Sequence, residues 1–209
     1  MSEALIAHYQ ALLAAHGPGA KAVQWADAET QTARFAVLCG IAPKLGRVLD
    51  VGCGLGHLHA FLKANGHGGS YHGVDIVPEF VAHANAAMAD DPDAQASLVA
   101  PDAPLPACDY ALLSGVFNNR MEDNWGFMTH TLRRMWDAAE EGIAFNAMTS
   151  HVDYHDDGLY YVDPMEVFAF CKRELGGHPT LRHDYALRPD GFPFEFAIYV
   201  RKRPASPLG

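Results

Sequence analysis

The densest group of residues suited to binding a nucleotide-like ligand runs from Asp50 to Gly56. An apolar stretch ends at Asp50, and glycines follow at positions 52, 54 and 56. Apolar residues then recur at helical spacing, so the segment predicts a buried strand, a tight turn and the start of a helix. Glycine suits this turn because it adopts positive φ freely and lets a ligand approach bare backbone. The helix N-terminus beyond it offers N–H groups to an electronegative part of the ligand.

The spacing of these glycines separates several cofactor motifs. In the dinucleotide fingerprint G-x-G-x-x-G/A, counted from Gly52, His57 occupies the third small position, and counting from Gly54 fits no better. The chain also lacks the G-x-x-x-x-G-K-[ST] of a P-loop. What remains is D-x-G-x-G-x-G, which resembles the first motif of class I S-adenosylmethionine-dependent methyltransferases. The resemblance implies that Asp50, Gly52, Cys53, Gly54 and Gly56 bind S-adenosylmethionine; the alternative is a tight turn without a ligand.

Two further carboxylates follow predicted strands. Asp75 ends the second predicted strand within the sequence Gly-Val-Asp-Ile, 25 residues after Asp50, where a carboxylate can accept both hydrogen bonds of a ribose diol. The resemblance assigns Asp75, with Ile76 beside it, to the ribose of the cofactor; the alternative is a cap for the helix starting at Pro78. Asp102 matches the family position near the adenine amino group, and a turn or capping role is the alternative there.

The loop after the fourth predicted strand runs from Ser114 to Arg120. Ligands of open α/β sheets bind outside the carboxyl ends of the strands, so we expect Ser114 to border the methyl donor. Asn118 or Asn119 can hydrogen-bond cofactor or substrate, or cap the next helix. The loop lacks the N-P-P-[YF] signature of methyltransferases that act on nucleic-acid or glutamine nitrogens.

Residues ahead of the glycine motif supply two further candidates. Many small-molecule members of the family fold an N-terminal helical segment over the cofactor. The resemblance therefore implies that Arg34 pairs with the methionine carboxylate or an acidic substrate, and that Trp25 forms part of a lid. The alternatives are a surface arginine and a packing tryptophan.

The segment from Ser150 to Asp157 is the richest titratable cluster in the chain. We expect His151 or His155 to serve as a general base that removes a proton from the methyl acceptor, and Tyr154 to contact that acceptor. The alternative is a solvated polar loop. We expect no metal, because hard and soft ligands are mixed at no recognised spacing.

Strands and helices alternate from Arg47 onward, which predicts an α/β fold with helices on both faces of a mostly parallel sheet. The predicted strands are 47–52, 71–76, 97–100, 110–116, 143–148, 181–187 and 194–201, the last two forming an antiparallel hairpin. This seven-stranded outline is that of the Rossmann-like class I methyltransferase fold, and the resemblance implies the order 3-2-1-4-5-7-6. We expect residues 1–46 to form an N-terminal helical extension of the domain at 47–209, with one helix capped by Asp27.

Composition limits the partners. The 209 residues include 15 basic and 25 acidic side chains, a net charge of −10, which argues against general affinity for nucleic acid or anionic membranes. No apolar stretch approaches the length of a membrane span, about 20 residues. The four cysteines show no C-x-x-C pairing and the first residues resemble no signal peptide, so we expect a cytoplasmic protein with reduced thiols.

The sequence therefore predicts methyl transfer from S-adenosylmethionine to an oxygen or nitrogen of a small molecule, with release of S-adenosylhomocysteine. Two alternatives stay open: a protein or RNA acceptor, and a cofactor-binding module without catalysis. The oligomeric state does not follow from the sequence.

Overall fold

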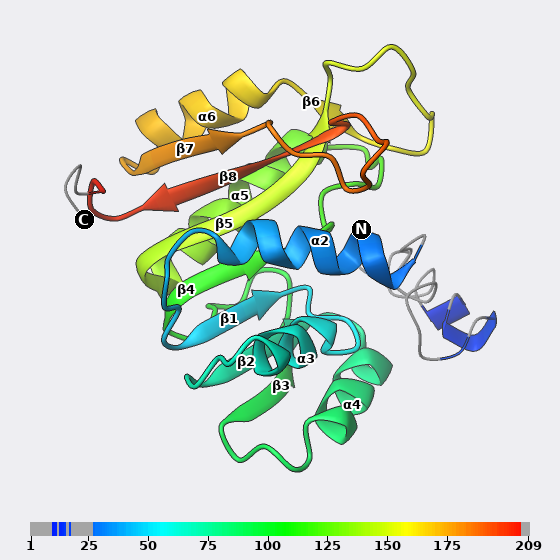
Figure 1. Ribbon diagram of the computed structural model, residues 1–209, viewed down its shortest axis with the longest axis vertical. Helices are drawn as coiled ribbons and strands as arrows, with labels where there is room; N and C mark the ends of the chain where they lie inside the picture. Colours follow the sequence, from blue (N-terminus) through cyan, green and yellow to red (C-terminus); the bar gives the residue numbers. More distant parts are fainter. Residues whose placement is uncertain (1–9, 12, 16, 18–26, 206–209) are drawn as a thin grey trace.

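The computed structural model describes residues 10–11, 13–15, 17 and 27–205. These residues form one sheet with the strand order β3-β2-β1-β4-β5-β8-β7, and β6 pairs with β5 beside this path. Figure 1 shows the sheet running from β3 to β7 through the molecule. The strands are β1 (Val48–Val51), β2 (Tyr71–Asp75), β3 (Ala94–Leu98), β4 (Cys108–Leu113), β5 (Ala139–Thr149), β6 (Tyr161–Val162), β7 (His178–Arg182) and β8 (Glu195–Arg201).

The predicted fold class and strand order are confirmed. Strands β1 to β6 pair in parallel, whereas β8 is antiparallel to both β5 and β7. Counting β7 and β8 as the sixth and seventh strands gives the order 3-2-1-4-5-7-6. The two-residue strand β6 was not predicted.

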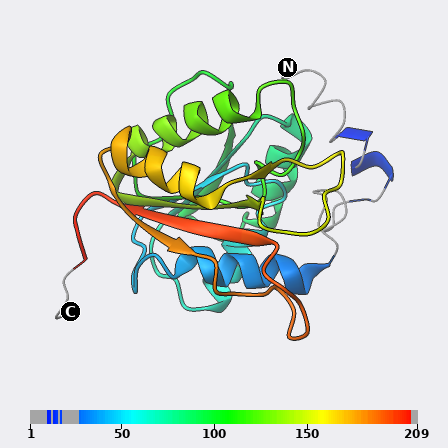
Figure 2. The same ribbon diagram turned by 90° about the horizontal axis from the view of Figure 1, so that it is seen from above.

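Helices cover both faces of the sheet. The helices are α2 (Ala28–Cys39), α3 (His57–Ala64), α4 (Pro78–Ala87), α5 (Asn124–Ala138) and α6 (Pro164–Arg173). One buried cluster joins the sheet to α2, α3 and α4, and a second joins it to α5 and α6. Figure 2 shows α2 on one side of the sheet and α5 with α6 on the other. None of the helices among the described residues has the length and apolar character of a membrane span.

Side-chain caps fix the starts of three helices. The carboxylates of Asp27, Asp123 and Asp163 each accept a backbone N–H of the following turn at 2.8 Å, which satisfies one of the donors a helix start leaves unpaired. The predicted helix start at Asp27 is confirmed. The sequence Asp163-Pro164-Met165-Glu166 likewise predicts a helix start, with Asp163 as the N-cap and Pro164 at the first helical position, and the structure confirms it.

Two predicted strands are displaced. The third lies at Ala94–Leu98 instead of 97–100, because an edge strand with exposed polar residues such as Gln95 lacks the apolar run on which the prediction relied. The sixth lies at His178–Arg182 instead of 181–187. Pro179 near its start disfavours a strand in the sequence, because proline has no N–H to donate. β7 is an edge strand, however, where such a residue is tolerated.

Candidate active site

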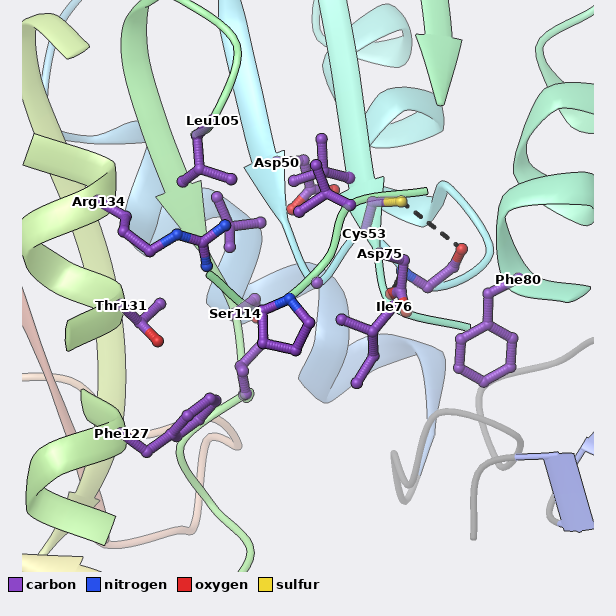
Figure 3. A pocket seen from close by; sticks show the side chains of 18 of the residues that line it. Asp50, Cys53, Asp75, Ile76, Phe80, Leu105, Ser114, Phe127, Thr131 and Arg134 are labelled. Carbon is purple, nitrogen blue, oxygen red and sulfur yellow. Dashed lines mark hydrogen bonds between the residues drawn. The ribbon is translucent and has the colours of Figure 1, made fainter. Parts of the chain in front are cut away.

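A cavity of about 570 Å³ opens at the carboxyl ends of β1, β2 and β4. This volume lies within the range typical of small-molecule sites, about 300–1,000 Å³. Its walls come from the glycine turn, the segments that follow β2, β3 and β4, and parts of α2 and α5. Figure 3 shows Thr131 and Arg134 of α5 on the opposite side of the cavity from Asp75 and Ile76.

The turn after β1 requires its glycines. Gly52, Gly54 and Gly56 have φ of 76°, 53° and 81°, a region that other residues rarely adopt. A Cβ atom on Gly52 would also lie only 2.4 Å from Cγ2 of Val116. The turn therefore packs against the segment after β4, and Gly56 serves as the N-cap of α3.

Asp75 connects this turn to the start of α4. Its Oδ2 accepts the N–H of Gly54 at 2.9 Å, and its Oδ1 accepts the N–H of Val77 at 3.0 Å. A carboxylate offers about four acceptor positions, so these two bonds leave capacity for a ligand in the cavity. The side chain is buried, and this desolvation raises the pKa of Asp75.

Asp50 lies deeper beneath the turn and is 3% exposed. Its Oδ2 accepts a hydrogen bond of 2.7 Å from the hydroxyl of Tyr71. Burial raises the pKa of Asp50 to about 7, an effect that the Tyr71 hydrogen bond opposes. The folded protein therefore holds a proton on this carboxyl at a higher pH than an exposed aspartate would.

Helix α5 and the segment after β3 form the opposite wall. Arg134 donates from Nε to the carbonyl oxygen of Ala103 at 3.0 Å and from Nη2 to that of Ala100 at 3.3 Å. His130 places Nε2 3.3 Å from Oδ1 of Asp102, an exposed side chain. Arg134 thus ties α5 to the loop that carries Asp102.

Sequence reasoning missed this α5 wall. Phe127, His130, Thr131 and Arg134 all line the cavity and stand at positions i, i+3, i+4 and i+7, the spacing of one helix face. This spacing is present in the sequence, but the neighbouring apolar face of the same helix is the stronger pattern. Gln31 and Phe35 of α2, together with His57, are further lining residues outside the predicted set.

The structure brings most of the predicted residues together. The lining includes Asp50, Gly52, Cys53, Gly54, Asp75, Ile76, Asp102, Ser114 and Asn119. Gly56 shapes the turn without lining the cavity, and Trp25 lies outside the described residues. The capping alternative for Asn118 and Asn119 is wrong, because Asp123 is the N-cap of α5. Asn118 does not line the cavity, and its carbonyl accepts the N–H of Tyr160 at 2.8 Å.

Arg34 takes a position that neither prediction described. It is 6% exposed, so the surface alternative is wrong, yet it does not line the cavity. Its Nε donates to Oε2 of Glu195 at 2.7 Å inside the protein. The structure therefore directs this guanidinium to a buried carboxylate and does not bring it to the cavity.

The predicted catalytic residues lie outside the cavity as well. His151 has an exposed side chain with Nε2 3.6 Å from Oδ1 of Asp163, and His155 stacks on Tyr161 with ring centroids 4.3 Å apart. Tyr154 is 76% exposed. None of these three lines the cavity, so the structure does not bring them to Asp75 or the glycine turn. Within the described part of the chain, no group of three or more metal-ligating side chains converges.

Comparison with known proteins decides the family. A family model described as a methyltransferase domain matches residues 49–142. Rv1506c of Mycobacterium tuberculosis, a candidate methyltransferase by name, is 36% identical over 159 residues, which are 73% of this chain and 91% of that protein. The chain belongs to the class I S-adenosylmethionine-dependent methyltransferases.

Solved structures share the fold of this methyltransferase. Magnesium protoporphyrin IX methyltransferase of Synechocystis PCC 6803, solved with S-adenosylhomocysteine, has 14% identity and a TM-score of 0.61, with 83% of each chain covered. Human N-acetylserotonin methyltransferase, solved with S-adenosylmethionine, has 17% identity and a TM-score of 0.63, covering 97% of this chain and 56% of the human one. At these identities the likeness establishes the fold alone.

The cofactor of the methyltransferase is S-adenosylmethionine, and the cavity fits such a ligand. A side chain at Gly52 would collide with the cavity wall, which keeps the backbone of the turn accessible. Ser114 lines the cavity with a buried Oγ that hydrogen-bonds to none of the described residues. A buried hydroxyl in this state is a suitable partner for a polar ligand.

Proposed function

We propose that the cavity holds S-adenosylmethionine and that the protein transfers its methyl group to an oxygen or nitrogen of a small molecule. The observation that carries the proposal is the meeting of the positive-φ glycine turn, Asp75 and the segments after β3 and β4 around one cavity at the carboxyl edge of the sheet. In this assignment Asp75 accepts the ribose hydroxyls, Asp102 accepts the adenine amino group, and the turn approaches the methionine end. When bound, the cofactor supplies an electrophilic methyl group and leaves as S-adenosylhomocysteine.

In this proposal the chain contributes mainly by binding and orientation. Rigid walls on two sides hold the reacting groups in line, and well-oriented reactions gain about 7–11 kcal/mol over free encounter. Ile76, Phe80 and Phe127 supply apolar lining that excludes water from the site. No base is required for an amine that reaches the site unprotonated, whereas a hydroxyl acceptor would lose its proton to solvent or to a side chain.

The charge of the lining supports a small acceptor over a nucleic acid. Among the described residues of the lining, the acidic side chains are Asp50, Asp75, Asp102 and Asp123, and the permanently charged cation is Arg134, which is hydrogen-bonded to backbone carbonyls. His57 adds no charge at neutral pH, because burial lowers its pKa. Nucleic-acid binding rests on Lys and Arg contacts to phosphate, so an acidic lining favours a neutral or cationic acceptor.

Calorimetry with S-adenosylmethionine tests the donor assignment. The wild-type protein should bind it, and Asp75→Ala should weaken binding at least about tenfold, since it removes a charged acceptor worth about 1.5–3 kcal/mol. Asp90→Ala is the control, because this carboxylate is exposed and remote from the cavity lining. Equal affinity in wild type and Asp75→Ala would refute the ribose assignment.

A labelled-methyl assay tests the acceptor class. Protein and radiolabelled S-adenosylmethionine are incubated with a cell extract separated into small-molecule, protein and RNA fractions. Label in the small-molecule fraction alone is the expected result. Label in protein or RNA would reverse the acceptor assignment, and binding without transfer to any fraction would favour a non-catalytic module.

A further inference from the structure

A buried polar network lies beside the cavity without lining it. Glu195, at the start of β8, is 1% exposed and accepts three hydrogen bonds. The donors are Arg34 Nε at 2.7 Å, Asn146 Nδ2 at 3.1 Å and the Tyr185 hydroxyl at 3.0 Å. Arg34 and Asn146 are buried as well. The network joins α2, β5, β8 and the segment after β7.

One end of this network reaches the segment after β4. The side-chain Oδ1 of Asn146 accepts the N–H of Gly115 at 2.9 Å. Gly115 lines the cavity and has φ of 74°, so this bond fixes the point at which the chain turns from β4 into the cavity wall. The next residue, Val116, is the one that packs against Gly52 of the glycine turn. A displacement of Gly115 would therefore be transmitted to the glycine turn through the side chain of Val116.

The other end reaches α2. Arg34 lies on this helix one turn after Gln31 and next to Phe35, and both of these residues line the cavity. The guanidinium also donates from Nη1 to the carbonyl oxygen of Thr30 at 3.4 Å. The ion pair with Glu195 thus fixes α2, and with it Gln31 and Phe35, relative to β8.

Stability alone explains this network poorly. Removing two charges from water is costly, and a buried ion pair generally contributes no more to stability than well-packed apolar residues of similar volume. What such a network does supply is a defined position for each partner, because every donor and acceptor must find its match. Here the positions that it defines belong to two walls of the cavity.

We propose that Arg34, Glu195 and Asn146 are positioning residues for the methyl-donor site: Asn146 sets the Ser114–Val116 wall through Gly115, and Arg34 sets the α2 wall. The inference rests on the proposed use of the cavity as the donor site. It assigns Arg34 a role in donor binding that acts through the protein and not through direct contact with the cofactor.

An exchange of amide and carboxylate tests the proposal. Asn146→Asp places two carboxylates together, and their repulsion should displace the side chain at position 146 from Gly115 and weaken binding of S-adenosylmethionine by about tenfold or more. The double variant Asn146→Asp/Glu195→Gln swaps the two groups. Its carboxylate at position 146 still accepts from Gly115, its amide at position 195 donates to that carboxylate, and Arg34 keeps an acceptor. This variant should restore the affinity to within about threefold of wild type, where tenfold corresponds to about 1.4 kcal/mol.

Amide hydrogen exchange distinguishes a positioning role from a general effect on stability. In Asn146→Asp the amide of Gly115 should lose protection from exchange, while the amide of Leu112, within β4, keeps it. The double variant should restore the protection of Gly115.

If Asn146→Asp fails to fold, a second variant tests the proposal. Arg34→Met/Glu195→Leu removes both charges together and is expected to fold with weakened donor binding. The control is Arg47→Met/Asp109→Asn, an ion pair at the opposite edge of the sheet.

The outcomes separate this inference from the proposed function. Wild-type affinity for S-adenosylmethionine in Asn146→Asp, or in the folded Arg34→Met/Glu195→Leu variant, would overturn the positioning role and leave the donor site intact. Failure of the exchange variant to restore affinity in a folded protein would overturn it too. A wild-type protein that binds no S-adenosylmethionine would refute the proposed function, and the inference with it.

Discussion

The substitution Gly52→Ala offers the sharpest test of how the glycine turn is built. Two separate penalties apply at this position. The φ of 76° costs an alanine about 1–2 kcal/mol, because its Cβ approaches the following carbonyl oxygen. The same Cβ would lie 2.4 Å from Cγ2 of Val116, well inside van der Waals contact. Relief requires movement of the wall after β4, and overpacking of this kind costs typically about 1–3 kcal/mol.

Gly66→Ala is a matched control for the first penalty. Gly66 has nearly the same φ, 77°, yet a Cβ there would meet nothing within 4 Å. Its substitution should lower the melting temperature by the conformational cost alone, and about 1 kcal/mol shifts the midpoint of a chain of this size by about 2–4 °C. Gly52→Ala should lower it by about twice as much or more.

Donor affinity should separate the two variants further. Gly52→Ala should weaken binding of S-adenosylmethionine in calorimetry, because the displaced Val116 lies in the cavity wall, whereas Gly66→Ala should bind as wild type does. Equal melting temperatures for the two variants would refute the packing argument. Unchanged affinity in a destabilised Gly52→Ala would show that the turn does not cradle the donor.

Three other predictions concern single side chains. The pKa of Asp50 is about 7 in the folded protein and 3.8 in the unfolded chain, so between these two pH values the folded state binds more protons and stability falls as pH rises. Urea unfolding should therefore give a lower free energy of unfolding at pH 7.5 than at pH 5. Asp50→Asn should reduce this difference. Arg134→Met should release the loop at Ala100 and Ala103 and weaken donor binding about tenfold, the size of effect expected when charge-assisted hydrogen bonds are lost. Arg133→Met, on the outer side of α5, is the control and should leave donor affinity unchanged. Equal affinities of the two variants would contradict the role of the loop. His151→Ala and His155→Ala should keep turnover within about twofold, because neither ring lines the cavity; a fall of about 10²-fold in either would establish the base that the sequence suggested.

The parts of the site that sequence reasoning found are those that local chemistry determines. Positive φ at Gly52, Gly54 and Gly56 follows from the residue type, and an acidic residue at the end of β2 follows from its place beside that turn. Helix caps at Asp27 and Asp163 are local as well, since donor and acceptor lie within three residues of each other. Such features need no knowledge of the tertiary structure.

Apart from the α5 wall, whose spacing is present in the sequence, the parts that it missed depend on contacts between distant segments. Arg34 and Glu195 are 161 residues apart, and no pattern within α2 indicates that the guanidinium turns toward β8. The titratable loop at 150–157 has the composition of a catalytic segment, but the pairing of β5 with β6 and the stacking of His155 on Tyr161 hold its side chains elsewhere. Residue type suggested chemistry there, and tertiary packing set the location.

This division between local and distant contacts leads to an expectation about variants. The turn and Asp75 form a floor whose shape depends on its own backbone, so substitutions there should change donor affinity and stability together. The walls from α2 and α5 are held by side chains such as Arg34 and Arg134, which bond to other segments of the chain. Replacing both partners of the Arg34–Glu195 pair by apolar residues should lower donor affinity while stability is largely kept, because a buried ion pair generally contributes no more to stability than apolar residues of similar volume. The floor and the walls of one cavity should therefore respond differently to mutation.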